Sequence, residues 1–298
     1  MREALRADEI DAAVGPRDFA ESRYQNLDDL ADRLAAGHWH VNDLPWNELP
    51  PLPIPDVVDA RRRKTFVEFG KHAIEVQLAA EHVAVTAAHH LLIFAERHRM
   101  HTSVRRALGA VLNDESSHVA VMLELQSRAD RAYPDVTIDA PPSPLFGAFV
   151  DAIPALHPAV VSIFMGAYEA MIAIRAYAEE ASYRHPSILG RMAGYAAHDD
   201  ALHAKVLRLV SHVILDGVRG SSPDAASYSA TVRRDVVEPL GTFWPLLVEH
   251  ERFLLHHDVR FQAELDRRVA ADAAIVRRFF TLLGLSAPDL TETPSTPR

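Results

Sequence analysis

The chain has 298 residues, 48% of them hydrophobic, and carries a formal net charge of -10 with no cysteine. A chain of this length can form one large domain with a substantial core. The negative charge argues against general binding to nucleic acid or anionic membranes, and the lack of cysteine excludes disulfides and thiolate metal ligands. Glycine is scarce, with 12 residues, while Ala, Leu, Arg and Glu are abundant. This composition predicts an all-α protein.

The N-terminal part of the chain, residues 1–56, precedes the main helical region. A short helix is predicted at residues 26–36, and a segment containing Trp39, Trp46 and five prolines follows it. Prolines at this density prevent a regular helix and favour extended chain, so we expect a strap that packs over the domain. The first residues lack an apolar signal core, and no uninterrupted apolar run reaches about 18 residues. We therefore expect a cytoplasmic protein that does not span a membrane.

Apolar residues at helical spacing predict four long helices in the middle of the chain, with Asp56 as the cap of the first. The predicted helices cover residues 57–98, 103–131, 158–183 and 187–216. Turns near residues 100 and 185 join them into two antiparallel hairpins.

Two or three further helices are expected within residues 224–284, interrupted near Pro239 and Pro245. The expected organisation is one domain over residues 1–298. It comprises the strap (1–56), a four-helix core (57–217), accessory C-terminal helices (218–284) and a flexible tail (285–298).

Two acidic-x-x-His pairs lie in the second and fourth predicted helices, Glu115 with His118 and Asp200 with His203. Residues three apart share one face of a helix, as two ligands of one metal ion require. However, a chain with 41 acidic residues and 17 histidines contains this pattern about as often by chance as it occurs here. The pairs therefore gain meaning only from their position and surroundings.

The two hairpins carry the same layout of carboxylates and imidazoles. Glu81 lies about 19 residues before the first turn and Glu115 about 15 after it; Glu169 lies about 16 before the second turn and Asp200 about 15 after it. Residues equidistant from the turn of an antiparallel hairpin lie at the same height. The spacing thus brings Glu81, Glu115, His118, Glu169, Asp200 and His203 to one level.

The surroundings of the two lone carboxylates favour a metal site. Glu169 lies in a stretch that is apolar all round, which is typical of a buried helix, and Glu81 has a weaker version of this environment. Neither has a Lys or Arg three or four residues away. A buried carboxylate without a partner costs several kcal/mol, which metal ligation or protonation would avoid. Most other histidines, among them His38 and His40, are interpreted as surface or outer residues.

Four carboxylates and two imidazoles from four helices resemble the ligand set of ferritin-like di-iron and di-manganese carboxylate proteins. The Asp-Glu-x-x-His form of residues 114–118, the Pro/Trp preface and the additional C-terminal helices are most similar to p-aminobenzoate N-oxygenases. The resemblance implies a ferritin-like four-helix bundle that holds two iron ions (Fe/Fe, or Mn/Fe). It also implies an O2-dependent oxygenase or oxidase acting on a small organic substrate such as an aryl-amine, with an external electron donor.

The sequence departs from that family at the fourth helix, where the family has His-x-x-x-Glu-x-x-His. Ala196 stands at the first histidine and Asp200 at the glutamate, with His198 nearby as a candidate third imidazole. Met122 stands where the usual ribonucleotide reductase small subunits have a radical tyrosine, which argues against that class. A hydroxylase or desaturase, a non-enzymatic ferroxidase or metal-binding protein, and a helical interaction protein remain alternatives. A monomer and a homodimer are both compatible with the sequence.

Overall fold

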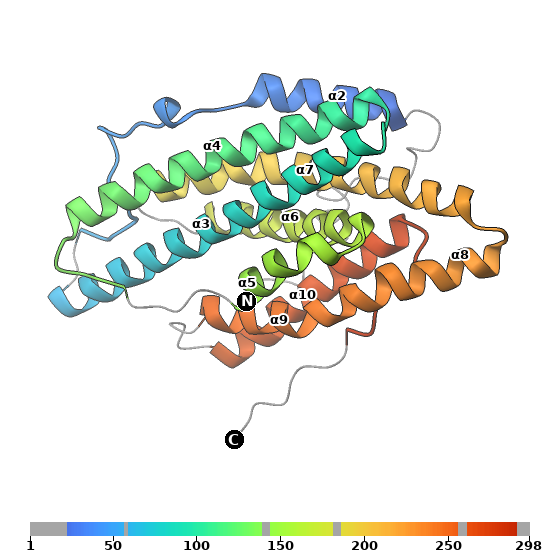
Figure 1. Ribbon diagram of the computed structural model, residues 1–298. Helices are drawn as coiled ribbons and strands as arrows, with labels where there is room; N and C mark the ends of the chain where they lie inside the picture. Colours follow the sequence, from blue (N-terminus) through green and yellow to red (C-terminus); the bar gives the residue numbers. More distant parts are fainter. Residues whose placement is uncertain (1–22, 57–58, 139–143, 181–185, 256–260, 291–298) are drawn as a thin grey trace.

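The protein is all-helical in the residues that the structure describes, which confirms the predicted all-α class. The computed structural model describes residues 23–56, 59–138, 144–180, 186–255 and 261–290. Its α-helices are α2 (Arg23–Gly37), α3 (Ala60–Arg97), α4 (Thr102–Ala132), α5 (Pro144–Ala152), α6 (Pro158–Glu180), α7 (Ile188–Ser221), α8 (Ala225–Val232), α9 (Glu238–Leu255) and α10 (Phe261–Leu282) (Figure 1). Two 3-10 turns, η1 (Val41–Asp43) and η2 (Ile153–Ala155), and one π turn, η3 (Arg233–Val237), complete the described elements.

Two helical hairpins form the centre of the molecule, α3 with α4 and α6 with α7. The hairpins also contact each other, α4 against α7 and α3 against α6, so the four helices enclose a shared interior. The helix predicted at 57–98 begins at Ala60, because the side chain of Asp59 rather than Asp56 accepts the backbone N–H of Arg62, at 3.0 Å. At the other end of the core, α7 continues past the predicted end at residue 216 to Ser221.

A tight turn between α3 and α4 fixes the register of the first hairpin. Arg99 adopts a left-handed conformation with φ of 49°, and the backbone N–H of Met100 donates to the carbonyl of Ala95 at 2.9 Å. This hydrogen bond and the left-handed residue terminate α3 within one turn. The short connection holds the two helices antiparallel, so residues equally far from it lie side by side.

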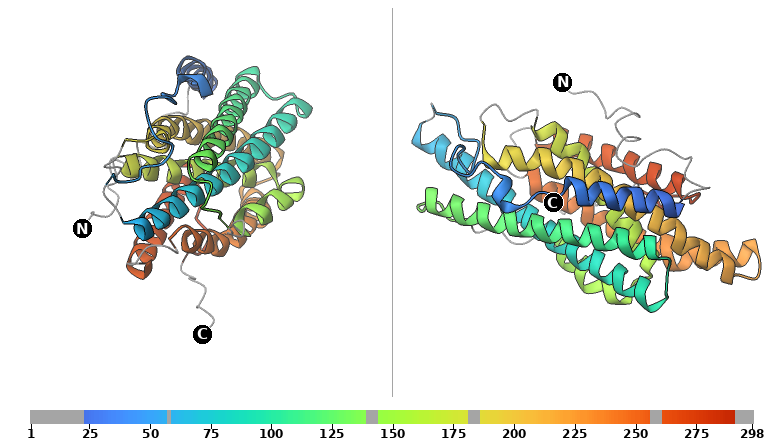
Figure 2. Two further views of the ribbon diagram at one scale, coloured as in Figure 1. Left: turned by 90° about the vertical axis from the view of Figure 1, so that its left-hand side faces the viewer. Right: turned by 90° about the horizontal axis from the view of Figure 1, so that it is seen from above.

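The chain that precedes α3 lies across the hairpins. Helix α2 packs against α4 and α7 on the upper side of the molecule (Figures 1 and 2). Residues 38–56, which we call the N-terminal segment, then bury Trp39 and Leu52 in a hydrophobic cluster shared with α3, α4 and α7. The carbonyl of Pro50 also accepts the backbone N–H of Ile188 at 2.9 Å, which satisfies a free donor at the start of α7.

Helices α9 and α10 lie against α6, on the side of the core opposite α2 (Figure 2). The expected interruption at Pro245 is wrong, because α9 continues through this proline. Phe243 and Trp244 before it and Leu247 after it are all buried, and this packing compensates for the lost backbone hydrogen bond. Near Pro239 the expected interruption takes the form of the π turn η3 just before it, which connects α8 directly to α9.

The packed chain extends beyond the expected end of the accessory helices at residue 284. Leu290 is buried and belongs to the main hydrophobic core, to which Leu285 and Ala287 also pack. The rest of the expected flexible tail, residues 291–298, lies outside the described residues.

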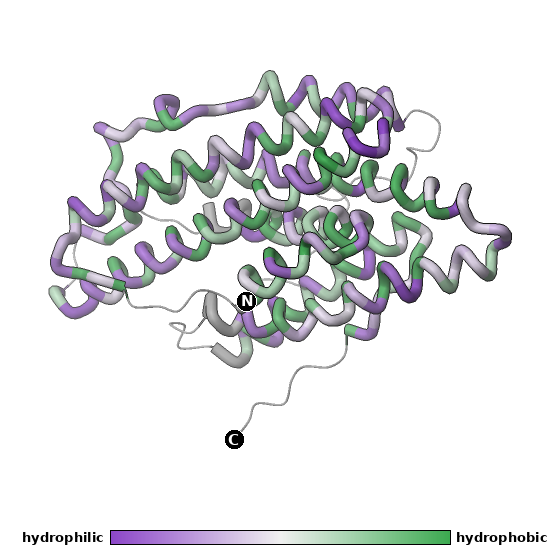
Figure 3. Tube along the Cα trace, in the orientation of Figure 1, coloured by the Kyte–Doolittle hydropathy of each residue, from purple (hydrophilic) through white to green (hydrophobic). Residues whose placement is uncertain are grey.

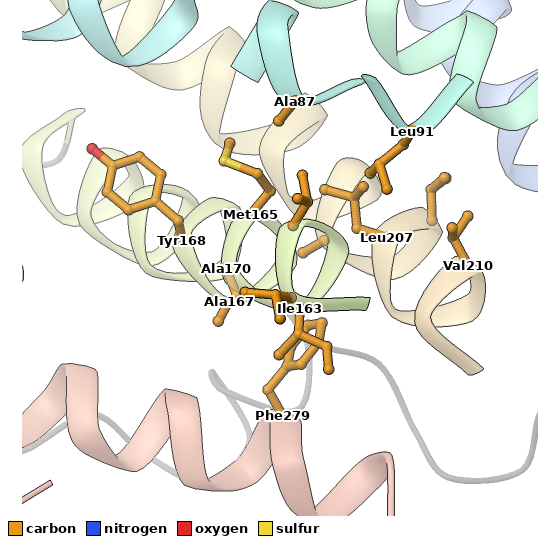
Figure 4. Packing of buried hydrophobic residues seen from close by; sticks show 14 of the residues in the cluster. Ala87, Leu91, Ile163, Met165, Ala167, Tyr168, Ala170, Leu207, Val210 and Phe279 are labelled. Atoms are coloured by element: carbon orange, nitrogen blue, oxygen red, sulfur yellow. The ribbon is translucent and has the colours of Figure 1, made fainter. Parts of the chain in front are cut away.

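The hydrophobic core follows from the amphipathic character of the helices. Apolar and polar residues alternate along them (Figure 3). Side chains of α3, α6, α7 and α10 meet in the centre, with Leu91, Ile163, Leu207 and Phe279 among them (Figure 4). By length and composition alone, α3 and the part of α6 from Pro158 to Arg175 would also suffice to cross a membrane. In the α6 stretch 72% of the residues are buried inside the protein, as in the core helix of any folded domain.

Candidate metal centre

The six predicted ligands come from the four central helices, and every one of them is buried. Their exposed fractions do not exceed 5% for Glu81 (α3), Glu115 and His118 (α4), Glu169 (α6), and Asp200 and His203 (α7). Burial of this many ionisable groups in one helical interior costs several kcal/mol for each unless they bind one another or a cation.

A first group of three side chains can hold one metal ion. Ligand atoms of Glu81, Glu115 and His118 all lie within 4.8 Å of one another. The Nδ1 atom of His118 is 3.4 Å from a Glu81 oxygen and 3.6 Å from a Glu115 oxygen. Gln77, one turn before Glu81 on α3, donates its amide to Glu81 Oε1 at 2.6 Å and so orients this carboxylate.

A second group shares one member with the first. Ligand atoms of Glu115, Glu169 and His203 also lie within 4.8 Å of one another. The Nδ1 atom of His203 is 2.7 Å from a Glu115 oxygen and 3.9 Å from a Glu169 oxygen. Glu115 therefore belongs to both groups.

Several atoms that face this centre lack hydrogen bonds. Among the described residues, the Nδ1 atoms of His118 and His203, Oε1 of Glu115 and Oδ2 of Asp200 are buried without a hydrogen bond of regular geometry, although Nδ1 of His203 and Oε1 of Glu115 lie 2.7 Å apart as an ion pair. Buried polar atoms in proteins are nearly always satisfied, so a cation among these atoms would be stabilising. Carboxylate oxygens with imidazole nitrogens are the donor set that iron, manganese and zinc accept in proteins. The residues of each group thus fit a metal ion.

Asp200 is the predicted ligand that the structure leaves outside both groups. Its side chain is buried, three residues before His203 on α7. It belongs to neither group of ligand atoms that lie within 4.8 Å of one another. Aspartate is one methylene shorter than glutamate, which accounts for the shorter reach.

Two further carboxylates contact the Nε2 atoms of the two imidazoles, and each carboxylate comes from the hairpin opposite to its imidazole. Asp199 Oδ2 lies 3.3 Å from Nε2 of His118, and Asp114 Oδ2 lies 3.3 Å from Nε2 of His203. A carboxylate on Nε2 keeps the proton there and turns the Nδ1 lone pair toward the metal position. Asp199 was not among the residues predicted from sequence, although the repeated acidic pairs at 114–115 and 199–200 could have indicated it.

The candidate third imidazole in the fourth central helix, α7, is His198. His198 is exposed and does not belong to either group, while Ala196 is buried and carries no ligand atom. The site in the described residues consequently has two imidazoles, one for each group. His38, interpreted from sequence as a surface or outer residue, lies outside both groups and pairs with the outer carboxylate Asp114.

Charges inside the centre are strongly coupled when no cation is present. Burial raises the pKa of Glu169 and Asp200 well above the usual carboxyl range, and nearby carboxylates add to the rise. Burial alone would raise the pKa of Glu115 too, but His203 and His118 lower it below its ordinary value. The pKa of both histidines is raised well above normal, against the effect of burial, by the carboxylates around them. Protons thus balance the buried negative charge that divalent cations would otherwise balance.

Comparison of the chain with protein-family models, with curated proteins and with solved structures gives no match. The functional assignment therefore depends on the chemistry of the centre. The centre itself consists of two buried Glu/His groups, each of which could hold a metal ion, with Glu115 common to both.

Proposed function

We propose that this protein is a ferritin-like di-iron carboxylate enzyme that uses O2 to oxidise a small organic substrate. The observation that carries the proposal is the pair of buried ligand groups sharing Glu115, each with one imidazole whose Nδ1 atom faces the carboxylates of its group. Shared carboxylates with one imidazole per metal are the general arrangement of di-metal carboxylate helical bundles.

Each ligand residue has a separate part in holding the metals. Glu81 and His118 would bind the first ion, Glu169 and His203 the second, and Glu115 both. Iron in such a site supplies the electrons that activate O2 toward an organic substrate. The protein keeps the centre dry, because all six predicted ligands are buried, and Asp114 and Asp199 hold the imidazoles in the ligating orientation.

The substrate class follows from the resemblance of the ligand pattern to p-aminobenzoate N-oxygenases. We propose N-oxygenation of an aryl-amine as the reaction, with electrons from an external donor and a cytoplasmic location. Within the described residues the centre has two imidazoles and the short Asp200, which distinguishes it from that pattern. With fewer protein ligands, a bound metal would have more room for O2 or substrate.

Metal stoichiometry tests the ligand assignment. Anaerobic addition of Fe(II) to metal-free protein should give two ions per chain, one ion for Glu81→Ala and for Glu169→Ala, and none for Glu115→Ala. Glu75→Ala, which removes an exposed carboxylate of α3, is the matched control and should still bind two. Less than one ion per wild-type chain would overturn the proposed function.

Rapid mixing with O2 tests the reaction class. We expect the Fe(II)-loaded protein to give a transient absorbance whose decay accelerates with an added aryl-amine, together with an N-oxygenated product. Decay that no aryl-amine changes, combined with release or storage of ferric iron, would indicate a ferroxidase instead of an oxygenase.

A further inference from the structure

The N-terminal segment places two consecutive side chains on the outer carboxylates of the metal centre. Trp39 Nε1 donates to Asp199 Oδ2 at 2.7 Å, and His38 Nδ1 pairs with Asp114 Oδ1. Trp39 and both carboxylates are buried. Because Asp114 belongs to α4 and Asp199 to α7, the segment lies across the seam between the two hairpins.

Each outer carboxylate is shared between this segment and one imidazole of the centre. Asp199 connects Trp39 to His118, and Asp114 connects His38 to His203, through contacts of 3.3 Å on the imidazole side. The result is two separate chains of three residues that begin at neighbouring positions in the sequence and end at the two different metal positions.

The physical effect of such a chain is orientational. A carboxylate that accepts two donors has less freedom to rotate than one with a single partner, and its imidazole therefore keeps a fixed tautomer and ring plane. Trp39 adds a second constraint, because its indole ring stacks on the His118 ring with centroids 5.2 Å apart and planes 28° apart. His38 is held in turn by Ser117, whose hydroxyl lies 3.1 Å from its Nε2.

We infer that Trp39 and His38 are positioning residues for the metal centre, Trp39 for the His118 position and His38 for the His203 position. The N-terminal segment thereby sets the metal affinity of the two halves independently. This inference rests on the proposed function, because it assumes that the two ligand groups bind metal.

Substitutions within the segment separate this role from a contribution to folding. Trp39→Phe keeps the stacked ring but removes the N–H, His38→Ala removes the imidazole, and His38→Asn restores an amide donor near the Nδ1 position. Matched controls are Trp46→Phe and Asn47→Ala, because Trp46 donates to the carbonyl of Val41 within the same segment and Asn47 is exposed. The measurement is an anaerobic Co(II) titration of the metal-free protein, with the melting temperature in chelator as a check on folding.

We expect Trp39→Phe and His38→Ala each to weaken one of the two Co(II) sites about tenfold, in line with the usual effect of losing an outer partner of a ligating histidine. His38→Asn should recover most of the loss, and the two controls should bind as the wild type does. All variants should melt in chelator at nearly the wild-type temperature.

Single-site backgrounds show which half each residue serves. In the Glu169→Ala background, which retains the His118 position, Trp39→Phe should weaken Co(II) binding and His38→Ala should not. In the Glu81→Ala background, which retains the His203 position, His38→Ala should weaken Co(II) binding and Trp39→Phe should not. Equal effects in both backgrounds, or no effect in either, would overturn the inference while leaving the proposed function intact. Failure of the wild-type protein to bind Co(II) or Fe(II) would instead overturn the proposed function.

Discussion

At the scale of single residues, Asp200 is where the two halves of the centre differ. The first acidic-x-x-His pair supplies Glu115, which reaches both ligand groups, whereas the second supplies an aspartate that reaches neither. Asp200 nevertheless remains buried, and its Oδ2 has no hydrogen-bond partner in the described structure. A buried carboxylate in this condition is costly, so a cation near it would be stabilising.

Lengthening this side chain should bring its carboxylate to the ligand groups. Asp200→Glu extends the carboxylate by one carbon–carbon bond, about 1.5 Å. We expect the affinity for metal to rise about tenfold, equivalent to about 1.4 kcal/mol, and Asp200→Asn to lower it because the negative charge is lost. Isothermal titration with Co(II) measures both. A loss of affinity in Asp200→Glu would show that Asp200 already binds metal at its present length.

The sequence was sufficient to predict the ligands that lie on long helices and insufficient for the contacts around them. Glu81, Glu115 and Glu169 follow from burial and from their distance to a short turn, both of which depend on helix geometry alone. The roles of His38 and Trp39 depend on the path of a proline-rich segment that has no periodicity. Such contacts are tertiary, and nothing in the local spacing of residues 38–56 indicates which helices they reach.

At the scale of helices, the close approach of α6 to its neighbours determines where Glu169 lies. Gly166 precedes Glu169 by three residues, and a Cβ atom placed on it would lie 2.6 Å from Cζ of Phe279 and 3.1 Å from Cβ of Leu207. Phe279 points from α10 toward α6 in the packed core (Figure 4). The absence of a side chain at residue 166 therefore allows three helices to meet one turn away from a metal ligand.

Substitution of this glycine should disturb both stability and metal binding. In Gly166→Ala the added methyl group collides with Phe279 and Leu207, so we expect a loss of about 1–3 kcal/mol in the free energy of unfolding despite the better helix propensity of alanine. The displaced α6 should also weaken metal binding at the group that contains Glu169. Urea denaturation and metal titration measure the two effects.

Gly109→Ala provides the control for helix propensity. Gly109 lies within α4, and a Cβ atom there would meet nothing within 4 Å. We expect this variant to be more stable than the wild type by about 0.5–1 kcal/mol, with metal binding unchanged. Equal stability changes in the two variants would show that the packing around Gly166 can relax without cost.

At the scale of the whole molecule, a buried ionic cluster joins the C-terminal helices to the core. Arg175 of α6 lies 2.6 Å from Oε1 of Glu251 in α9 and 2.6 Å from Oδ2 of Asp272 in α10. Arg268 approaches the second Glu251 oxygen at 3.8 Å from the half-buried edge of the cluster. Accessory helices are predicted here from sequence but no ionic cluster, because the members of the cluster are separated by up to 97 residues along the chain.

This cluster should make the stability of the protein depend on pH. Burial raises the pKa of Glu251 from 4.5 to about 7, although Arg175 acts in the opposite direction. A carboxyl group whose pKa is raised in the folded state contributes its stability when protonated. That contribution is complete below about pH 4.5 and is lost as the pH rises through about 7.

Replacing Glu251 with glutamine isolates its effect from that of the metal ligands, whose own pKa values are also shifted. Between pH 5 and pH 8 we expect the wild type to lose on the order of 2–3 kcal/mol of unfolding free energy relative to Glu251→Gln, because the amide cannot ionise. Urea denaturation of metal-free protein across this range measures the difference. Glu249→Gln, at an exposed position of the same helix, should follow the wild-type curve. If the curves of wild type and Glu251→Gln run parallel, the carboxylate is ionised throughout, and Arg175 and Arg268 together outweigh its burial.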